Sequence, residues 1–124
     1  MTVAILVALA GLAMLSYGAL DRAFVRAEAG EVAVFLSEAR QRAAESGTPQ
    51  QIEFDVRTAT LSAGPTVERV GRGVSLVAPE PATVWPIIIQ PSGENGGAMI
   101  DFVRGEARAR VRLDWLTGRV ELQR

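Results

Sequence analysis

The chain has 124 residues, enough for one small domain and one further segment, and its 13 basic and 14 acidic residues leave a net charge of −1. This near balance gives no reason to expect nucleic acid or an acidic surface as the main partner. The chain contains neither cysteine nor histidine, which excludes disulfides, thiolate metal sites, the common zinc sites and catalysis by Ser-His-Asp or Cys-His groups.

The first predicted element is a hydrophobic helix. Residues 2–20 carry no charge, and at about 1.5 Å per residue they cover roughly 28 Å, close to the ~30 Å hydrocarbon core of a bilayer. A cleavable signal peptide is disfavoured because no basic residue precedes Arg22 and the apolar run is too long. A buried core helix is disfavoured because so small a domain cannot cover a helix that is apolar on every face. We therefore predict a membrane anchor, in which small residues such as Gly11 suit either ordinary membrane-helix composition or close helix–helix contact.

The helical pattern continues beyond the hydrophobic span to residue 46. Apolar residues recur on one helical face at Val32, Phe35, Leu36, Ala39 and Ala43. Charged residues, Glu28 among them, are assigned to the other faces. Gly47 and Pro49 then stop the helix. The sequence thus predicts one helix of up to ~45 residues, roughly 65 Å long, whose amphipathic upper half packs against a small domain.

After Pro49 the apolar period changes from 3.6 to 2, which predicts about six or seven short antiparallel strands. The predicted strands are residues 51–56, 58–62, 74–77, 87–89, 98–103, 107–114 and 119–123. Residues 79–86 (PEPATVWP) are expected to form a proline-rich loop outside any central sheet, and residues 87–89 a strand buried on both faces. Along 107–114, alanine, valine and leucine alternate with Arg108, Arg110 and Arg112, which predicts an apolar face and a charged face.

Three stretches of the chain, in this order and spacing, resemble one known family. They are the hydrophobic MTVAILVALAGLAML, the passage ARQRAAESGTPQQIEF (39–54), and the pair QPSGENGGAMIDF (90–102) and LDWLTGRVEL (113–122). Together they resemble the type IV pilin-like proteins, and among them the H-type minor pseudopilins of type II secretion with the related FimT pilins (the GspH/FimT family). The resemblance covers nearly the whole chain.

The resemblance implies a pilin-like α+β fold, with a long N-terminal helix on a small antiparallel β-domain of two sheets. Residues 1–20 would be the transmembrane half of the helix, 21–48 its amphipathic upper half, and 49–124 a periplasmic β-rich domain. The expected location is the bacterial inner membrane, single-pass. Expected partners are other pseudopilins of the shaft and tip, which contact the N-terminal helix, and the membrane. No cofactor and no catalytic residue are expected.

The family's prepilin-peptidase site is not present in this chain. Met1 falls just after the place where the family's Glu, four residues beyond the new N-terminus, is expected. We favour a misassigned or trimmed start, with prepilin peptidase acting on a longer precursor. A fragment and a divergent, unprocessed member remain open. No processing or methylation residue is therefore assigned.

The candidate partner contacts are Gly11, Phe24, Trp115, Arg108, Arg110 and Arg112. The arginine row would suit phosphate or DNA, but acidic neighbours in the sequence favour an ordinary solvated face. Trp115 at a hairpin tip suits either an interface anchor or a cap on a small core. Glu94, Asn95 and Asp101 would suit calcium, yet a glycine-rich loop without a bound ion is the favoured interpretation.

Three functions compete on these observations. The favoured function is a minor pseudopilin, a structural and non-catalytic subunit of the type II secretion pseudopilus that helps export folded proteins. The second is a FimT-like minor type IV pilin involved in pilus assembly or DNA uptake. The third is an unrelated single-pass membrane protein with a small β-type binding domain.

Overall fold

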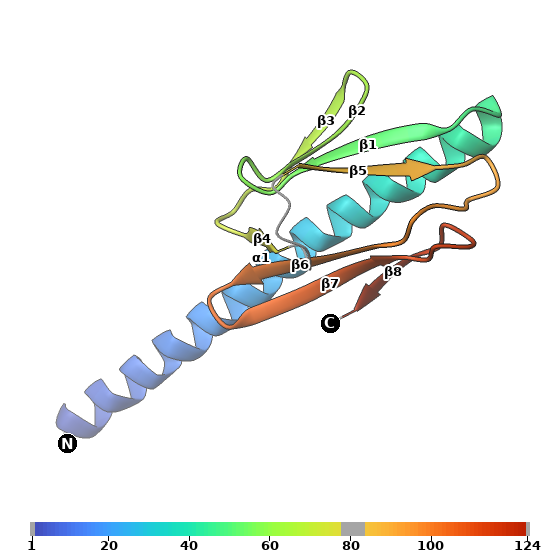
Figure 1. The fold of residues 1–124 in the computed structure, drawn as a ribbon. Helices are drawn as coiled ribbons and strands as arrows, with labels where there is room; N and C mark the ends of the chain where they lie inside the picture. Colours follow the sequence, from blue (N-terminus) through green and yellow to red (C-terminus); the bar gives the residue numbers. More distant parts are fainter. Residues whose placement is uncertain (1, 78–83, 124) are drawn as a thin grey trace.

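The computed structural model describes residues 2–77 and 84–123, with the backbone alone for residues 2–17, 84 and 85. One long helix lies across two four-stranded antiparallel sheets (Figure 1), and the three share one apolar core. The elements in these residues are the helix α1 (Thr2–Ser46) and the strands β1 (Gln50–Asp55), β2 (Thr60–Ala63), β3 (Thr66–Arg69), β4 (Ser75–Val77), β5 (Val84–Ile89), β6 (Ala98–Arg104), β7 (Ala107–Leu113) and β8 (Val120–Gln123). This arrangement confirms the predicted α+β class and the two sheets.

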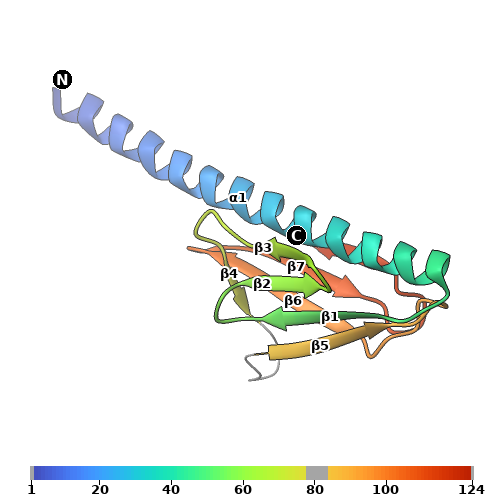
Figure 2. The ribbon, with the colours of Figure 1, turned by 90° about the horizontal axis from the view of Figure 1, so that it is seen from above.

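Helix α1 is continuous, and its upper half supplies the centre of the core. The fully buried helix positions repeat every three or four residues, so they share one face: Val25, Ala29, Val32, Leu36, Ala39 and Ala43. The helix ends at Ser46 because Gly47 adopts a φ of 68° and donates its N–H to the Ala43 carbonyl at 3.0 Å. The N-terminal part of α1 extends beyond the sheets (Figures 1 and 2).

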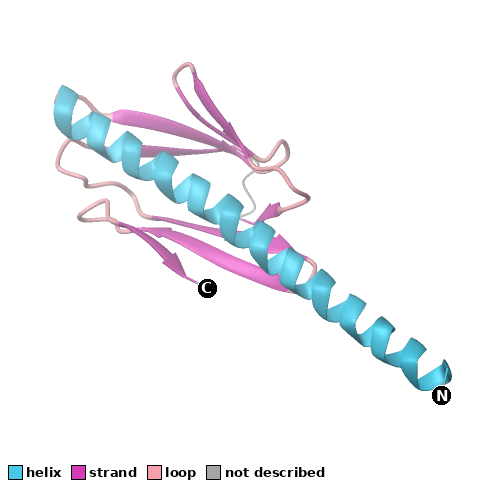
Figure 3. Cartoon of the chain, turned by 180° about the vertical axis from the view of Figure 1, so that it is seen from behind, coloured by secondary structure: helices cyan, strands magenta, loops and turns pink. Residues whose placement is uncertain are grey.

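The two sheets lie on either side of the helix axis when the molecule is seen from behind (Figure 3). Sheet A has the strand order β3-β2-β1-β5, and sheet B the order β4-β6-β7-β8. Alternate residues of each sheet point inward to the helix and are buried, among them Phe54 and Ile89 in sheet A and Phe102 and Val111 in sheet B. The outward residues of both sheets are polar for the most part, so each sheet has one buried face.

Four details of the sequence-based prediction are wrong. The described residues contain eight strands, because Thr66–Arg69 forms β3, which a turn-rich context concealed. Strand β5 begins at Val84, within the predicted proline-rich loop, and it includes Pro86. This is possible because β5 is the outer strand of sheet A and pairs with β1 alone. Ile88 is 46% exposed, so β5 is buried on one face rather than two.

The fourth correction concerns Glu28, which was assigned to an outer face of the helix. It is only 4% exposed, since it lies on the side of α1 that the turn before β4 covers. A buried carboxylate requires a partner, and Arg72 provides it from 3.7 Å.

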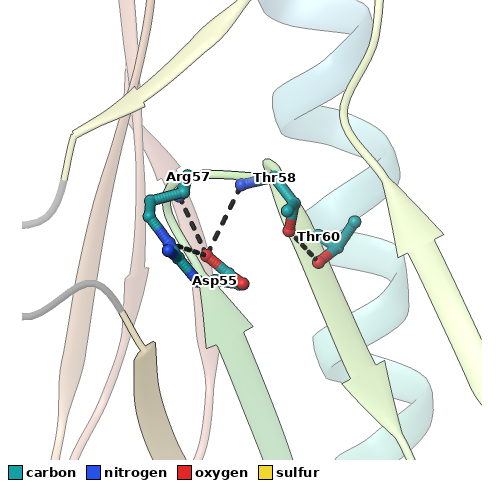
Figure 4. Close-up of polar contacts among 4 residues, drawn as sticks. All are labelled: Asp55, Arg57, Thr58 and Thr60. Atoms are coloured by element: carbon teal, nitrogen blue, oxygen red, sulfur yellow. Dashed lines mark hydrogen bonds and ion pairs between the residues drawn. The ribbon is translucent and has the colours of Figure 1, made fainter.

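The turn between β1 and β2 sets the direction of the β2–β3 hairpin (Figure 4). Asp55 Oδ1 accepts the backbone N–H groups of Arg57 at 3.0 Å and of Thr58 at 3.4 Å. Ala59 then adopts a positive φ of 52°, and its carbonyl accepts the N–H of Val70 at 2.8 Å. These contacts lie at the open end of the hairpin, where β2 begins and β3 ends.

Candidate interaction surfaces

The candidate contact residues do not form one site. Phe24 lies against the end of β6, whereas Trp115 follows the far end of β7. The three arginines lie on the exposed face of β7 between these ends. Gly11 lies in the part of α1 whose side chains are outside the described set. The structure thus presents several separate surfaces.

Phe24 takes part in a contact within the chain. The guanidinium of Arg104 lies 4.4 Å from the centroid of its ring, and that of Arg72 lies 5.9 Å from it. Arg104 also forms an ion pair with Asp21 at 2.8 Å, and its Nη1 donates to the carbonyl of Arg72. We call Asp21, Phe24, Arg72 and Arg104 the exit cluster, because they join the helix to the end of β6 and to the turn before β4 at the point where the helix leaves the domain.

The arginine row lies on the outer face of sheet B, as the alternation predicted. Arg110 makes a two-pronged contact with Asp101 across the strands, at 2.7 and 3.2 Å. The hydrogen bond from Arg110 lowers the pKa of Asp101, and the charge of the arginine lowers it further. Partial burial of the carboxyl acts in the opposite direction. Arg108 and Arg112 are exposed, and neither forms an ion pair with another described residue.

Trp115 and Leu116 form an exposed apolar tip on the β7–β8 turn, with 59% and 54% of their surfaces accessible. The turn is rigidly built, because Asp114 Oδ1 accepts the N–H groups of Leu116 at 2.9 Å and Thr117 at 3.4 Å. These hydrogen bonds lower the pKa of the Asp114 carboxyl. A preformed exposed tryptophan is the kind of residue that anchors protein–protein contacts.

The loop that was considered for calcium is fastened to this tip instead. The backbone N–H of Asn95 donates to the Trp115 carbonyl at 2.8 Å, and its Nδ2 donates to the Asp114 carbonyl at 2.7 Å. Its Oδ1 accepts the N–H of Gly97 at 2.7 Å. Asp101 is engaged by Arg110, and within residues 2–77 and 84–123 no group of three acidic side chains is arranged to hold a metal.

A groove of about 830 Å³ between α1 and the β2–β3 hairpin escaped the sequence-based prediction. Its lining combines apolar and charged residues: Arg26, Ala27, Gly30, Glu31, Val34, Phe35, Glu38, Thr66, Glu68 and Arg72. Burial raises the pKa of Glu68, and the charges of Glu31, Glu28 and Glu38 raise it further. The sequence offers only Gly30 and Val34, a glycine and a valine outside the apolar stripe of the helix, as a local sign of this groove. The groove could not be predicted because its other wall depends on the position of β3.

The predicted membrane segment, residues 2–20, falls almost entirely where only the backbone is described. Among the described residues, no helix combines the length and the apolar character needed to cross a membrane.

Comparison with known proteins leaves the sequence without a match and the fold with a clear one. No protein-family profile matches the chain, and no curated protein matches its sequence. The fold is similar to the structure of the minor pseudopilin EpsH from the type 2 secretion system of Vibrio cholerae, with a TM-score of 0.64 and 18% sequence identity. The similarity covers 79% of this chain and 94% of that one. The chain therefore has a pilin-like fold, with a long N-terminal helix on two antiparallel sheets.

Proposed function

We propose that this chain is a minor pseudopilin, a structural subunit of a type II secretion pseudopilus that helps export folded proteins. The observation that carries the proposal is the fold, which matches that of a minor pseudopilin over most of both chains. The sequence motifs in the helix, the 39–54 passage and the closing hairpin agree with it. The proposed role contains no chemical step, so the protein acts by binding and not by catalysis.

In this proposal the two halves of α1 have different tasks. Residues 2–20 carry no charge and would anchor the chain in the inner membrane, with the β-domain in the periplasm. The same segment, which includes Gly11, would contact the helices of neighbouring pseudopilins, since small residues permit close helix approach. The upper half of α1 packs within the β-domain, because its apolar face is buried under both sheets.

The exposed tip is the candidate contact on the globular part. Trp115 and Leu116 stand on a turn held by several hydrogen bonds, among them two to Asp114 Oδ1 and two from Asn95. An anchor fixed in this way loses little conformational entropy on binding. We propose that it contacts the next subunit of the filament.

In-cell crosslinking tests the proposed function. A photoreactive residue at position 11 of the full chain, expressed with the secretion genes of its own host, should join it to other pilin-like subunits. The same residue at Gln51, on the outer face of sheet A, is the matched control and should give few such products. A gene deletion should also stop export of the folded substrate, and the intact gene should restore it. Absence of pilin-like partners together with normal export would contradict the proposal.

A DNA-binding minor pilin remains the second function to separate. No contact among the described residues favours it, because Arg110 is already bound to Asp101. Labelled DNA that shifts with the full chain at low salt, and no longer shifts after Arg108→Glu and Arg112→Glu, would support that function instead.

A further inference from the structure

The place where α1 leaves the β-domain (Figure 2) carries two arginines to which the proposed function gives no role. Arg22 and Arg26 follow closely on the uncharged residues 2–20. Both are exposed, and among residues 2–77 and 84–123 neither forms an ion pair. They are four residues apart, so they lie on the same side of the helix, about 6 Å apart along its axis.

The side chain of Arg22 is directed back toward the uncharged segment. Its Nη1 atom lies 3.5 Å from the position that a Cβ atom at Gly18 would take, so the guanidinium covers the preceding turn of the helix. Long side chains on a helix commonly point toward its N-terminus in this way. In an anchored chain, this direction brings the positive charge to the level where residues 2–20 end, which is the surface of the bilayer.

The β-domain neutralises the acidic residue at the same level of the helix. Asp21 precedes Arg22 and would repel an anion, but Arg104 holds its carboxylate at 2.8 Å. The turn between β6 and β7 packs closely on this carboxylate, because a Cβ atom added at Gly105 would lie 2.7 Å from Asp21 Oδ2. Glu106 on the same turn is exposed and has no ion pair. The described residues at this exit therefore keep two free arginines against one free carboxylate.

The position of these two arginines calls for a ligand at the membrane surface. Arginine and lysine next to a membrane span are enriched on the cytoplasmic side, whereas the proposed function has the β-domain in the periplasm. Phospholipid phosphates are present at both surfaces of a bilayer, and a guanidinium binds phosphate through paired N–H groups. Each headgroup layer is roughly 5–8 Å thick, so two arginines about 6 Å apart along the helix fit within one layer.

We propose that Arg22 and Arg26 bind phosphate groups of phospholipids at the periplasmic surface of the inner membrane, and that Arg104 keeps the charge of Asp21 out of this contact. The inference rests on the proposed function, because it requires residues 2–20 to lie in the membrane and the β-domain to lie in the periplasm. The contact sets the depth of the helix in the bilayer, and it has to break when the subunit leaves the bilayer for a filament.

Solid-state NMR of the full chain tests the inference in vesicles of phosphatidylcholine mixed with phosphatidylglycerol. Arginine labelled with carbon-13 at the guanidinium carbon should show dipolar coupling to lipid phosphorus. The double variant R22Q/R26Q should lose most of this coupling. The matched control R112Q/R119Q, which removes two exposed arginines at the far end of the β-domain, should keep it. Arg104→Gln should weaken the coupling by freeing the Asp21 carboxylate, and Asp21→Asn added to that variant should restore it.

Flotation of the vesicles separates a failure of this inference from a failure of the proposed function. A chain that does not float with the vesicles would overturn both the membrane anchor and the phosphate contact. A chain that floats but shows no carbon–phosphorus coupling, or a double variant that keeps the coupling, overturns the inference alone and leaves the secretion role standing.

Two further arms test the identity of the ligand. Excess inorganic phosphate that displaces the lipid coupling would show that the arginines take free phosphate, which overturns the lipid contact. A photoreactive residue at position 22 should be joined to phospholipid in cells. If it is joined only to a pilin-like subunit, these arginines belong to a protein contact and the inference is wrong.

Discussion

Replacing Arg104 with alanine tests whether the exit cluster fastens the helix to the β-domain. The side chain makes three contacts at once: the ion pair with Asp21 at 2.8 Å, the stacking on Phe24 at 4.4 Å, and the hydrogen bond to the carbonyl of Arg72. The Arg104 and Asp21 side chains are 28% and 27% exposed, so water screens the ion pair only in part. The substitution removes all three contacts and leaves Asp21 without its partner.

The expected loss of stability follows from these contacts. A partly exposed ion pair contributes up to about 1 kcal/mol, and an arginine over an aromatic ring about 0.5–2 kcal/mol. A hydrogen bond from a charged donor adds about 1.5 kcal/mol. Contacts of one side chain are not additive, so we expect a loss of about 2–3 kcal/mol for Arg104→Ala. At roughly 3–5 °C per kcal/mol for a chain of this size, Tm should fall by about 6–15 °C.

Thermal unfolding of the full chain in non-ionic detergent, followed by circular dichroism, measures this loss. Arg108→Ala is the matched control, since it removes an exposed arginine from the neighbouring strand and should change stability by less than about 0.5 kcal/mol. Hydrogen exchange should also accelerate in residues 19–28 more than in residues 36–43. The reasoning is refuted if Arg104→Ala loses no more stability than the control, or if exchange accelerates uniformly along the helix.

Three further predictions concern Glu68, Asp114 and Gly93. The folded-state pKa of Glu68 is raised, so its contribution to stability is complete below the unfolded pKa of about 4.3 and is lost as pH rises through the folded value. Glu68→Gln should therefore be more stable than the natural chain at pH 7 and equal to it at pH 3, as denaturant midpoints will show. The folded-state pKa of Asp114 is lowered, so its ionised carboxyl stabilises the fold above its unfolded pKa of about 3.9. This stabilisation is lost as pH falls through the folded-state pKa. Asp114→Asn should therefore flatten the acid limb of the curve of stability against pH. Gly93 has a φ of 92°, and a Cβ atom added there would lie 2.1 Å from the Thr117 carbonyl oxygen. Gly93→Ala should therefore lower the free energy of unfolding by at least about 2 kcal/mol in the same assay. Gly96→Ala is the control and should be nearly neutral, because the space around Gly96 is open.

The parts of the fold that the sequence predicted are those with strong periodicity. The helix stripe through Val32, Leu36 and Ala39 and the alternation along β7 each have a regular period, and the structure confirms both. The isoleucine run of β5 was misjudged because a short apolar run carries no sign of which face is covered. Only the position of β5 at the edge of sheet A explains why Ile88 is exposed and why Pro86 is tolerated.

The interaction surfaces were harder to predict because they depend on residues far apart in the sequence. The exit cluster brings Asp21 and Phe24 together with Arg104, which no local pattern links. The acidic groove requires β3, a strand of four residues with one inward glutamate, to lie beside the helix. The arginine row was visible as a pattern, yet its pairing through Asp101 became apparent only from the register of β6 and β7.

The order in which the core residues are synthesised has a consequence for the newly made chain. The apolar face of α1, from Val25 to Ala43, is complete early, but strand β7, which covers part of it, ends only at Leu113. At about 5–20 residues per second, translation of the intervening roughly seventy residues takes several seconds. During that interval β7 does not yet cover the apolar face of the helix. A newly made chain of this fold therefore depends on rapid completion, or on a chaperone that covers this face, to avoid aggregation.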